Sequence, residues 1–399
     1  MHVRELVQSG IPQVLVDVWE RRGIAELTQV QATALAHDSF QTERNLLLIA
    51  PTSSGKTFIG EVAAVLTALN MRRVVYLVPM KAIAEEKFTD FKETYGDPSI
   101  GIRIVISSGD HSEYDGEILT GNYNLAVIVY EKFGQLLVQA PDILTMCGLV
   151  VLDELQLMRD RNRGSRLEML VTRILMSPQP PRLIGLSATL RDLNGLDAWL
   201  RAEVIESRDR PVPLIEGICD LSGTISYYHS DGTVSAERVP LSALCQSPDE
   251  LLSRLVEVYS PNWQILVFVS TKDATKDIAE ACCRVLPSLD VQRDVADRFE
   301  LLDETEFKAF MQHEGLIHRV GYHNADLDPD ERVLTERLFR DGFLRVLVST
   351  TTLAIGVNLP SDLVIVRDVE RWDQRARIPI PTSEYKNAAG RAGRLGART

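Results

Sequence analysis

The chain has 399 residues, 45% of them hydrophobic, which is enough for more than one core and suggests two or three domains. Its formal net charge of −13 argues against a uniformly basic nucleic-acid-binding protein. The charge is uneven, however, because residues 367–399 hold eight Arg and Lys against four Asp and Glu. Such a local excess is compatible with an acidic exterior around a basic binding surface.

The sequence shows no sign of a membrane or secreted protein. It contains no run of about 18 apolar residues, and the first ten residues lack the plan of a signal peptide. The five cysteines are odd in number and lack metal-ligand spacing, so a disulfide framework is not expected. Cys282 and Cys283 are expected in a helix, as core and near-surface residues. We therefore expect a cytoplasmic protein without a membrane span.

In chain order, residues 1–44 are predicted to be helical, and apolar strand-like runs then alternate with helical patterns. Near-continuous apolar strands separated by helices indicate a parallel sheet covered on both faces. The rhythm breaks at about 207–234, where a hairpin-like GTISYYHSDGT stretch occurs, and then resumes. We predict two α/β lobes, 1–205 and 206–399. The predicted strands are 46–49, 73–78, 103–107, 125–130, 149–152, 183–186, 265–269, 316–320, 345–348 and 363–366.

The first chemical motif is the stretch NLLLIAPTSSGKT, residues 45–57. Its apolar run, small polar loop and helical continuation give the strand, loop and helix that a phosphate-binding loop requires. Backbone N–H groups would cradle the phosphates, with Lys56 on the β- and γ-phosphates and the Thr57 hydroxyl on Mg²⁺. The full pattern G-x-x-x-x-G-K-[ST] is missed because Ala50 replaces its first glycine. An ordinary strand-to-helix turn with a solvated Lys56 is the alternative. Only one of the two lobes has such a loop, which suggests a nucleotide held between them.

A second motif, LVVLDELQ at 149–156, is an apolar strand that ends in two carboxylates. Strand ends are where an open α/β sheet presents ligands to its crevice. Asp153 would hold Mg²⁺ and Glu154 would orient or deprotonate the attacking water. The alternative is an exposed acidic pair at a helix start, which the helix dipole favours.

With these motifs in place, the sequence resembles the superfamily two helicases, specifically the Ski-type branch of archaeal repair helicases and RNA-exosome helicases. The resemblance covers nearly the whole chain in order. The matching segments are LTQVQATAL (27–35), APTSSGKT (50–57, motif I), VPMKAIAEEK (78–87, Ia), VYEKFGQLL (129–137, Ib), DELQ (153–156, II), SATL (187–190, III), LVFVST (266–271, IV), VLVSTTTLAIGVNLP (346–360, V) and NAAGRAGRLG (387–396, VI).

The resemblance implies two RecA-like domains with mainly parallel sheets and an ATP cleft between the lobes. Gln31 stands at the adenine-reading position. The implied nucleotide-binding residues also include Thr52, Ser53, Ser54, Gly55, Lys56, Thr57, Gly356 and Asn358. Arg391 and Arg394, three residues apart, would share a helix face and act as arginine fingers. Solvated or ion-paired arginines are the alternative.

The resemblance also implies contacts to a nucleic-acid backbone, which position a strand without reading its sequence. The corresponding residues are Pro79, Lys81, Tyr130, Lys132, Ser270, Thr271, His323 and Thr350. Ordinary capping or turns remain open for each Ser and Thr, and a structural role remains open for His323. Residues 367–380 correspond to a strand-separating hairpin, where Trp372 would stack on a base or pack on its own lobe.

Two departures from the family pattern bear on function. Gln156 replaces the histidine that usually ends motif II; it can still hydrogen-bond motif III or the arginine helix but cannot become charged. The chain also ends at Thr399, just after motif VI, where the family continues with winged-helix and ratchet domains. We therefore expect a fragment or a minimal two-lobe protein.

We predict an ATP- and Mg²⁺-dependent helicase or translocase that acts as a monomer on single-stranded DNA, with 3′→5′ polarity, in repair or genome maintenance. A Ski-type RNA helicase stays open, because backbone tracking tolerates either polymer. So do an ATP-dependent switch and a duplex translocase that does not separate strands.

Overall fold

The computed structural model describes residues 1–393 except 53, 161–162, 189–191, 211, 230–231, 242–243, 351–358 and 374–375. The chain divides into two compact units, Met1–Pro211 and Val212–Thr399. The division expected after residue 205 stays a prediction. No helix in the described part of the chain is both long and apolar enough to cross a membrane.

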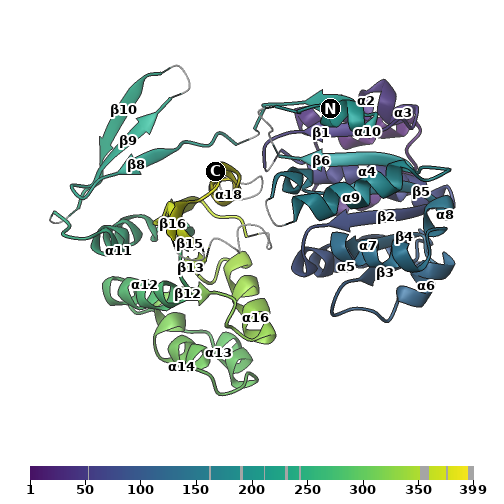
Figure 1. The fold of residues 1–399 in the computed structure, drawn as a ribbon. Helices are drawn as coiled ribbons and strands as arrows, with labels where there is room; N and C mark the ends of the chain where they lie inside the picture. Colours follow the sequence, from purple (N-terminus) through teal and green to yellow (C-terminus); the bar gives the residue numbers. More distant parts are fainter. Residues whose placement is uncertain are drawn as a thin grey trace. The chain divides into compact units, whose positions relative to one another are not determined.

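Unit one is built on a parallel sheet, which among the described residues has seven strands in the order β3-β4-β2-β5-β6-β1-β7 (Figure 1). Its strands are β1 (Leu46–Ile49), β2 (Arg73–Val78), β3 (Ile104–Ser107), β4 (Leu125–Val129), β5 (Cys147–Leu152), β6 (Arg182–Ser187) and β7 (Glu203–Glu206). Strands β1 to β6 are almost wholly buried, as their near-continuous apolar sequences require.

Helices cover both faces of this sheet (Figure 1). Alternate strand residues separate two cores, because successive side chains point to opposite faces: Leu46 and Leu48 belong to one core, and Leu47 and Ile49 to the other. The first core takes η1 (Val3–Ser9), α1 (Gln13–Arg21), α2 (Gln29–Ala36), α3 (Asp38–Gln41), α4 (Lys56–Leu69) and α5 (Lys81–Tyr95). The second takes α6 (Asp115–Thr120), α7 (Tyr130–Gln139), α8 (Ile143–Met146), η2 (Leu155–Arg159), α9 (Gly164–Leu175) and α10 (Leu196–Leu200).

Unit two holds a parallel sheet whose described strands run in the order β12-β13-β11-β14. They are β11 (Ile265–Val269), β12 (Val320–His323), β13 (Val346–Thr350) and β14 (Leu363–Val366). The accompanying helices are α11 (Pro248–Tyr259), α12 (Lys272–Val285), α13 (Arg293–Glu300), α14 (Glu306–Phe310), η3 (Met311–Gly315), α15 (Leu316–His318), α16 (Pro329–Arg340) and α18 (Thr382–Ala389). The expected pair of parallel α/β units is confirmed.

Two antiparallel elements complete unit two (Figure 1). Strands β8 (Gly217–Cys219), β9 (Thr224–Tyr228) and β10 (Val234–Arg238) form a separate sheet, which confirms the predicted hairpin. Strands β15 (Glu370–Asp373) and β16 (Ala376–Pro379) pair as a second hairpin at the position that the family resemblance indicated.

Two sequence-based expectations need correction. The strand predicted at 316–320 is wrong, because Leu316–His318 is helical and β12 begins only at Val320. Arg319, in the left-handed region at φ 60°, ends the helix between them. Cys282 and Cys283 do lie in helix α12, but both are buried, so Cys283 is not near the surface.

Candidate nucleotide site and nucleic-acid contacts

The phosphate loop leaves the sheet at the carboxyl end of β1. The Ala50 N–H donates to the Ser187 carbonyl at 3.1 Å, which ties the start of the loop to β6. Helix α4 then begins at Lys56, with Gly55 as its N-cap at φ 88°. A Cβ at Gly55 would lie 2.3 Å from Gln31 Nε2. Both the backbone conformation and this close approach therefore require glycine.

The segment around Gln31 supports the loop directly. Thr28 and Gln31 form a capping box at the start of α2, in which Gln31 Oε1 accepts from the Thr28 N–H at 2.9 Å. Gln31 Nε2 also donates to the Gly55 carbonyl at 3.1 Å, and Thr28 Oγ1 donates to the Ser54 carbonyl at 2.9 Å. Gln31 thus holds the loop in shape, and its adenine-reading role stays a prediction.

The loop residues fit a phosphate group. Ser54 Oγ is buried and has no hydrogen-bond partner among the described residues, although an unpaired buried hydroxyl is costly. Lys56 is only 5% exposed and lies in the first turn of α4, where backbone N–H groups lack helical acceptors. Thr52 and Thr57 are half-buried beside them. A bound phosphate would satisfy these donors.

The acidic pair lies at the carboxyl end of β5. Asp153 is 5% exposed; its Oδ1 accepts from the Glu154 N–H at 2.9 Å and its Oδ2 from the Tyr76 hydroxyl at 3.2 Å. Burial and the adjacent Glu154 raise the pKa of Asp153, whereas the charges of Lys87 and Lys56 act in the opposite direction. The structure therefore brings the predicted Lys56 and Asp153 into one electrostatic neighbourhood. Glu154 is half-buried and adopts a left-handed backbone at φ 55°.

Gln156 connects the acidic pair to motif III. Its Oε1 accepts from the Ala188 N–H at 2.9 Å and from Ser187 Oγ at 3.1 Å, while its Nε2 donates to Glu154 Oε2. The predicted hydrogen bond to motif III is confirmed. Strand β6 lies between β5 and β1, so this amide joins the acidic pair to the strand whose carbonyl also holds Ala50.

A buried polar cluster behind α4 was missed in the sequence. Tyr95 receives a hydrogen bond from Trp19 Nε1 at 2.7 Å and donates to Glu61, which also pairs with Arg22 at 2.5 Å. Arg22 in turn pairs with both oxygens of Asp90 at 3.0 Å. This cluster fastens the N-terminal helices to the helix that carries Lys56. Its one sequence signal was an acid, Glu61, inside an otherwise apolar helix.

The predicted nucleic-acid residues of unit one differ in accessibility. Lys81 is half-exposed and pairs with Asp110 at 2.6 Å, and Lys132 pairs with Asp115 at 2.6 Å. Pro79 is buried. Tyr130 is 3% exposed and donates to the Asp153 carbonyl at 2.6 Å, so in this structure it supports the end of β5. Burial raises the pKa of Tyr130.

In unit two, the structure places most of the predicted contact residues in local structural roles. Thr271 caps α12 by accepting from the Ala274 N–H at 3.3 Å, and the Ser270 N–H donates to Asp368 at 2.8 Å. His323 is 6% exposed and its Nε2 lies 2.9 Å from Glu336 Oε1. Thr350 is also buried. The role of these residues in nucleic-acid contact stays a prediction.

The helix expected to carry the two arginines ends before Arg391, and their shared face stays a prediction. Helix α18 ends at Ala389, Gly390 is its C-cap, and Gly393 has a left-handed backbone at φ 64°. Arg391, which is buried, therefore lies beyond the end of this helix. Ser53, Gly356, Asn358 and Arg394 fall outside the described residues, as does the side chain of Trp372.

The donors at this site suit magnesium more than a protein-caged metal. The described residues contain no cluster of three or more His, Cys, Asp and Glu able to hold a metal ion. Mg²⁺ needs no such cluster, because it keeps waters and binds through one or two carboxylates and substrate phosphates. The buried Asp153 and the half-buried Thr57 fit that role.

Comparisons with known proteins agree with this geometry. Residues 28–196 match the DEAD/DEAH box helicase family and residues 248–396 match the helicase conserved C-terminal domain. Three relatives carry the name ATP-dependent DNA helicase Hel308. The protein from Pyrobaculum calidifontis is 36% identical over 98% of this chain and 54% of its own length. That from Caldivirga maquilingensis is 36% identical over 99% and 51%, and that from Pyrococcus horikoshii 33% identical over 99% and 52%.

The chain thus spans about half the length of the curated relatives it matches. The two family matches lie on different units, the first on the unit that carries the phosphate loop and the acidic pair. With both helicase domains present in order, the chain belongs to the superfamily two helicases.

Proposed function

We propose that this chain is the motor core of an ATP-dependent helicase or translocase that moves along single-stranded DNA in the 3′→5′ direction. The observation that carries the proposal is the connected set of groups at the ends of three adjacent strands. The phosphate loop follows β1, the acidic pair follows β5, and Gln156 bonds Ser187 and Ala188 at the end of β6 between them. A change at the nucleotide can therefore reach motif III through one side chain.

The proposed roles follow from chemistry. ATP is the substrate, and Mg²⁺ would neutralise charge that develops on its phosphates. Lys56 and the N-terminus of α4 would bind the phosphates, with Thr57 and Asp153 as the protein ligands of Mg²⁺. Glu154 would orient and deprotonate water. Arg391 and Arg394 remain the proposed stabilisers of charge on the γ-phosphate.

The preference for DNA is supported by the names of the relatives, which are DNA helicases. The polarity, action as a monomer and a place in repair or genome maintenance rest on the family resemblance. A Ski-type RNA helicase and a nucleotide-dependent switch are the competing functions, because the same site would serve each of them.

Steady-state ATP hydrolysis tests the proposal. We would compare residues 1–399 alone, with single-stranded DNA, with single-stranded RNA and with duplex. Glu154→Gln is the inactive reference, and Glu93→Gln, which removes one exposed charge on α5, is the matched control. Loss of the general base should lower hydrolysis by about 10²- to 10⁴-fold, with the control unaffected.

The polymer that stimulates hydrolysis decides among the candidates. Stimulation by single-stranded DNA supports the proposal, whereas stimulation only by RNA or only by duplex assigns one of the alternatives. Hydrolysis that no nucleic acid changes contradicts the motor proposal. A tracking protein should also lose affinity with rising salt, at a slope of about −0.7 per phosphate contact on a single strand; a switch should show a flat slope.

A further inference from the structure

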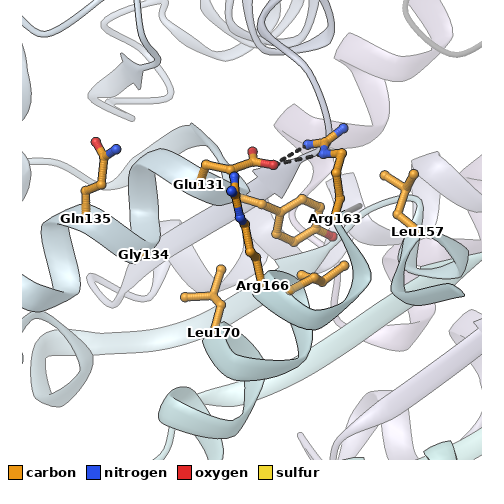
Figure 2. Close-up of a pocket in the computed structure, with 9 residues that line it drawn as sticks. Glu131, Gly134, Gln135, Leu157, Arg163, Arg166 and Leu170 are labelled. Atoms are coloured by element: carbon orange, nitrogen blue, oxygen red, sulfur yellow. Dashed lines mark hydrogen bonds and ion pairs between the residues drawn. The ribbon is translucent and has the colours of Figure 1, made fainter. Parts of the chain in front are cut away.

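A pocket lies on unit one between helices α7 and α9, close to η2 (Figure 2). Its volume is about 210 Å³. Leu157, Leu167 and Leu170 form an apolar wall, and Leu167 and Leu170 are buried. Two arginines also line the pocket: Arg163, the residue before α9, and Arg166, in the first turn of α9. The pocket therefore combines an apolar interior with two cationic side chains at its edge.

Arg163 connects this pocket to two segments that were predicted to follow a nucleic-acid backbone. Figure 2 shows its guanidinium directed at Glu131, at 2.8 Å. The same guanidinium also donates to the Pro79 carbonyl. Glu131 lies in motif Ib and Pro79 in motif Ia, so the pocket wall is fixed to both segments. A strand that follows these segments would pass the pocket.

Arg166 supplies a charge that is available to a ligand. Its side chain is exposed and makes no ion pair with any residue in the part of the chain that the structure describes. By contrast, the guanidinium of Arg163 is already engaged. A free cation beside an apolar hollow suits a ligand with a flat apolar ring and an anionic group attached to it.

We propose that this pocket receives one unstacked base of the bound DNA strand, with the flanking phosphate near Arg166. The inference rests on the proposed function and adds to it a single-base subsite. The volume is about seven times the ~30 Å³ share of one water molecule and below the ~300 Å³ of pockets for drug-sized ligands. The pocket is therefore large enough for one planar ring system but too small for a whole nucleotide. Every base has an apolar face, so the subsite would tolerate any sequence.

Gly134 offers a way to close the pocket without disturbing its walls. It lies inside α7 and lines the pocket, and a Cβ built there meets nothing within 4 Å. Leucine at this position would fill the space, and replacing an interior helical glycine favours the helix. Gly134→Ala tests the backbone change alone. Gly116→Leu is the matched control elsewhere, since a Cβ on Gly116 of α6 also meets nothing within 4 Å.

The experiment uses residues 1–399, a non-hydrolysable ATP analogue and a hairpin DNA with a 3′ single-stranded tail, which fixes the register of the protein against the duplex. A single abasic residue is moved through the tail and the affinity is measured at each position. We expect one position at which the abasic residue weakens binding by roughly 5- to 150-fold, the range for loss of one base-stacking contact. Gly134→Leu should flatten this profile, while Gly134→Ala and Gly116→Leu should retain it.

The outcomes separate the two proposals. A flat profile in the unmodified protein, with tail binding and DNA-stimulated hydrolysis intact, overturns the base subsite alone and leaves the pocket to another occupant such as a protein side chain. A profile that survives Gly134→Leu also overturns it. If the protein binds no tail and DNA does not stimulate hydrolysis, both the subsite and the proposed function fail. A flat profile in the unmodified protein overturns the subsite whether or not a variant folds, whereas a position-specific loss is assigned to this pocket by its disappearance in Gly134→Leu.

Discussion

Gly55→Ala should be among the most damaging single-methyl additions in unit one. The residue sits at φ 88°, where an L side chain is strained by roughly 1–2 kcal/mol. Its new Cβ would also lie 2.3 Å from Gln31 Nε2. Moving the Gln31 amide away breaks its bonds to the Gly55 carbonyl and the Thr28 N–H. At about 0.5–1.5 kcal/mol for each hydrogen bond, the total cost is about 2–5 kcal/mol.

Gly23→Ala isolates the contact from the strain. Gly23 has nearly the same φ of 82°, but a Cβ there meets nothing within 4 Å, so this variant should lose only the conformational share of about 1–2 kcal/mol. Denaturant unfolding of both variants measures the difference. Gln31→Ala should cost less in the Gly55→Ala background than in the unmodified protein, because the two Gln31 bonds are already broken there. Equal losses for the two glycine variants would refute the reasoning. ATP affinity should fall only for Gly55→Ala.

Three further changes test other parts of the site. Because the pKa of Asp153 is raised, the folded protein holds the carboxyl proton more tightly than the unfolded chain does. The protein therefore loses stability as the pH rises from the ordinary pKa of an aspartate through the raised pKa of Asp153. Asp153→Asn avoids that loss, so its advantage in Tm should be absent in acid and grow toward neutral pH. Arg22→Met should cost about 3 kcal/mol of unfolding free energy, because it leaves the buried Glu61 carboxylate with only a phenolic donor. Gln156→Leu leaves the Ala188 N–H without its acceptor, which should cost about 1–3 kcal/mol and reduce stimulation of hydrolysis by DNA.

Each of these has an outcome that contradicts it. A stability gain for Asp153→Asn that is independent of pH would mean that the charge of the carboxyl is not the cause. Arg21→Met changes a neighbouring arginine whose side chain, among the described residues, bonds the exposed Asp17 carbonyl alone. A loss equal to that of Arg22→Met would therefore argue against the buried pair. Stimulation by DNA that survives Gln156→Leu at full strength would show that this amide carries no coupling.

Local patterns were sufficient to predict most of the fold. The strands predicted at 46–49, 73–78, 265–269 and 363–366 begin and end as in the structure, because buried parallel strands are short apolar runs bounded by polar residues. The strand predicted at 316–320 is wrong because a short buried apolar run can belong to a helix as well as to a strand. Leu316 is buried as expected, but it lies in the short helix α15.

The parts of the site that the sequence did not reveal depend on contacts between distant residues. Motif spacing located Lys56, Asp153 and Gln156, but not the contact of Gln31 with the Gly55 carbonyl. The cluster around Glu61 joins residues from three helices, so no local pattern identifies its members. The end of α18 before Arg391 was missed because the spacing of two arginines does not reveal that the helix already ends at Ala389, with Gly390 as its C-cap.

The order of strands in unit one also has a consequence for biosynthesis. Strand β1, which leads into the phosphate loop, pairs with β6 and β7 and with no other strand in the described part of the chain, and β6 begins at Arg182. At a synthesis rate of about 5–20 residues per second, the LLLI segment waits on the order of 7–27 s for its first neighbour. During that time its backbone N–H and C=O groups and its apolar side chains have no sheet to join. The strand that leads into the phosphate loop is thus among the last of the unit to pair. Protection of the nascent chain against aggregation would matter most at this segment.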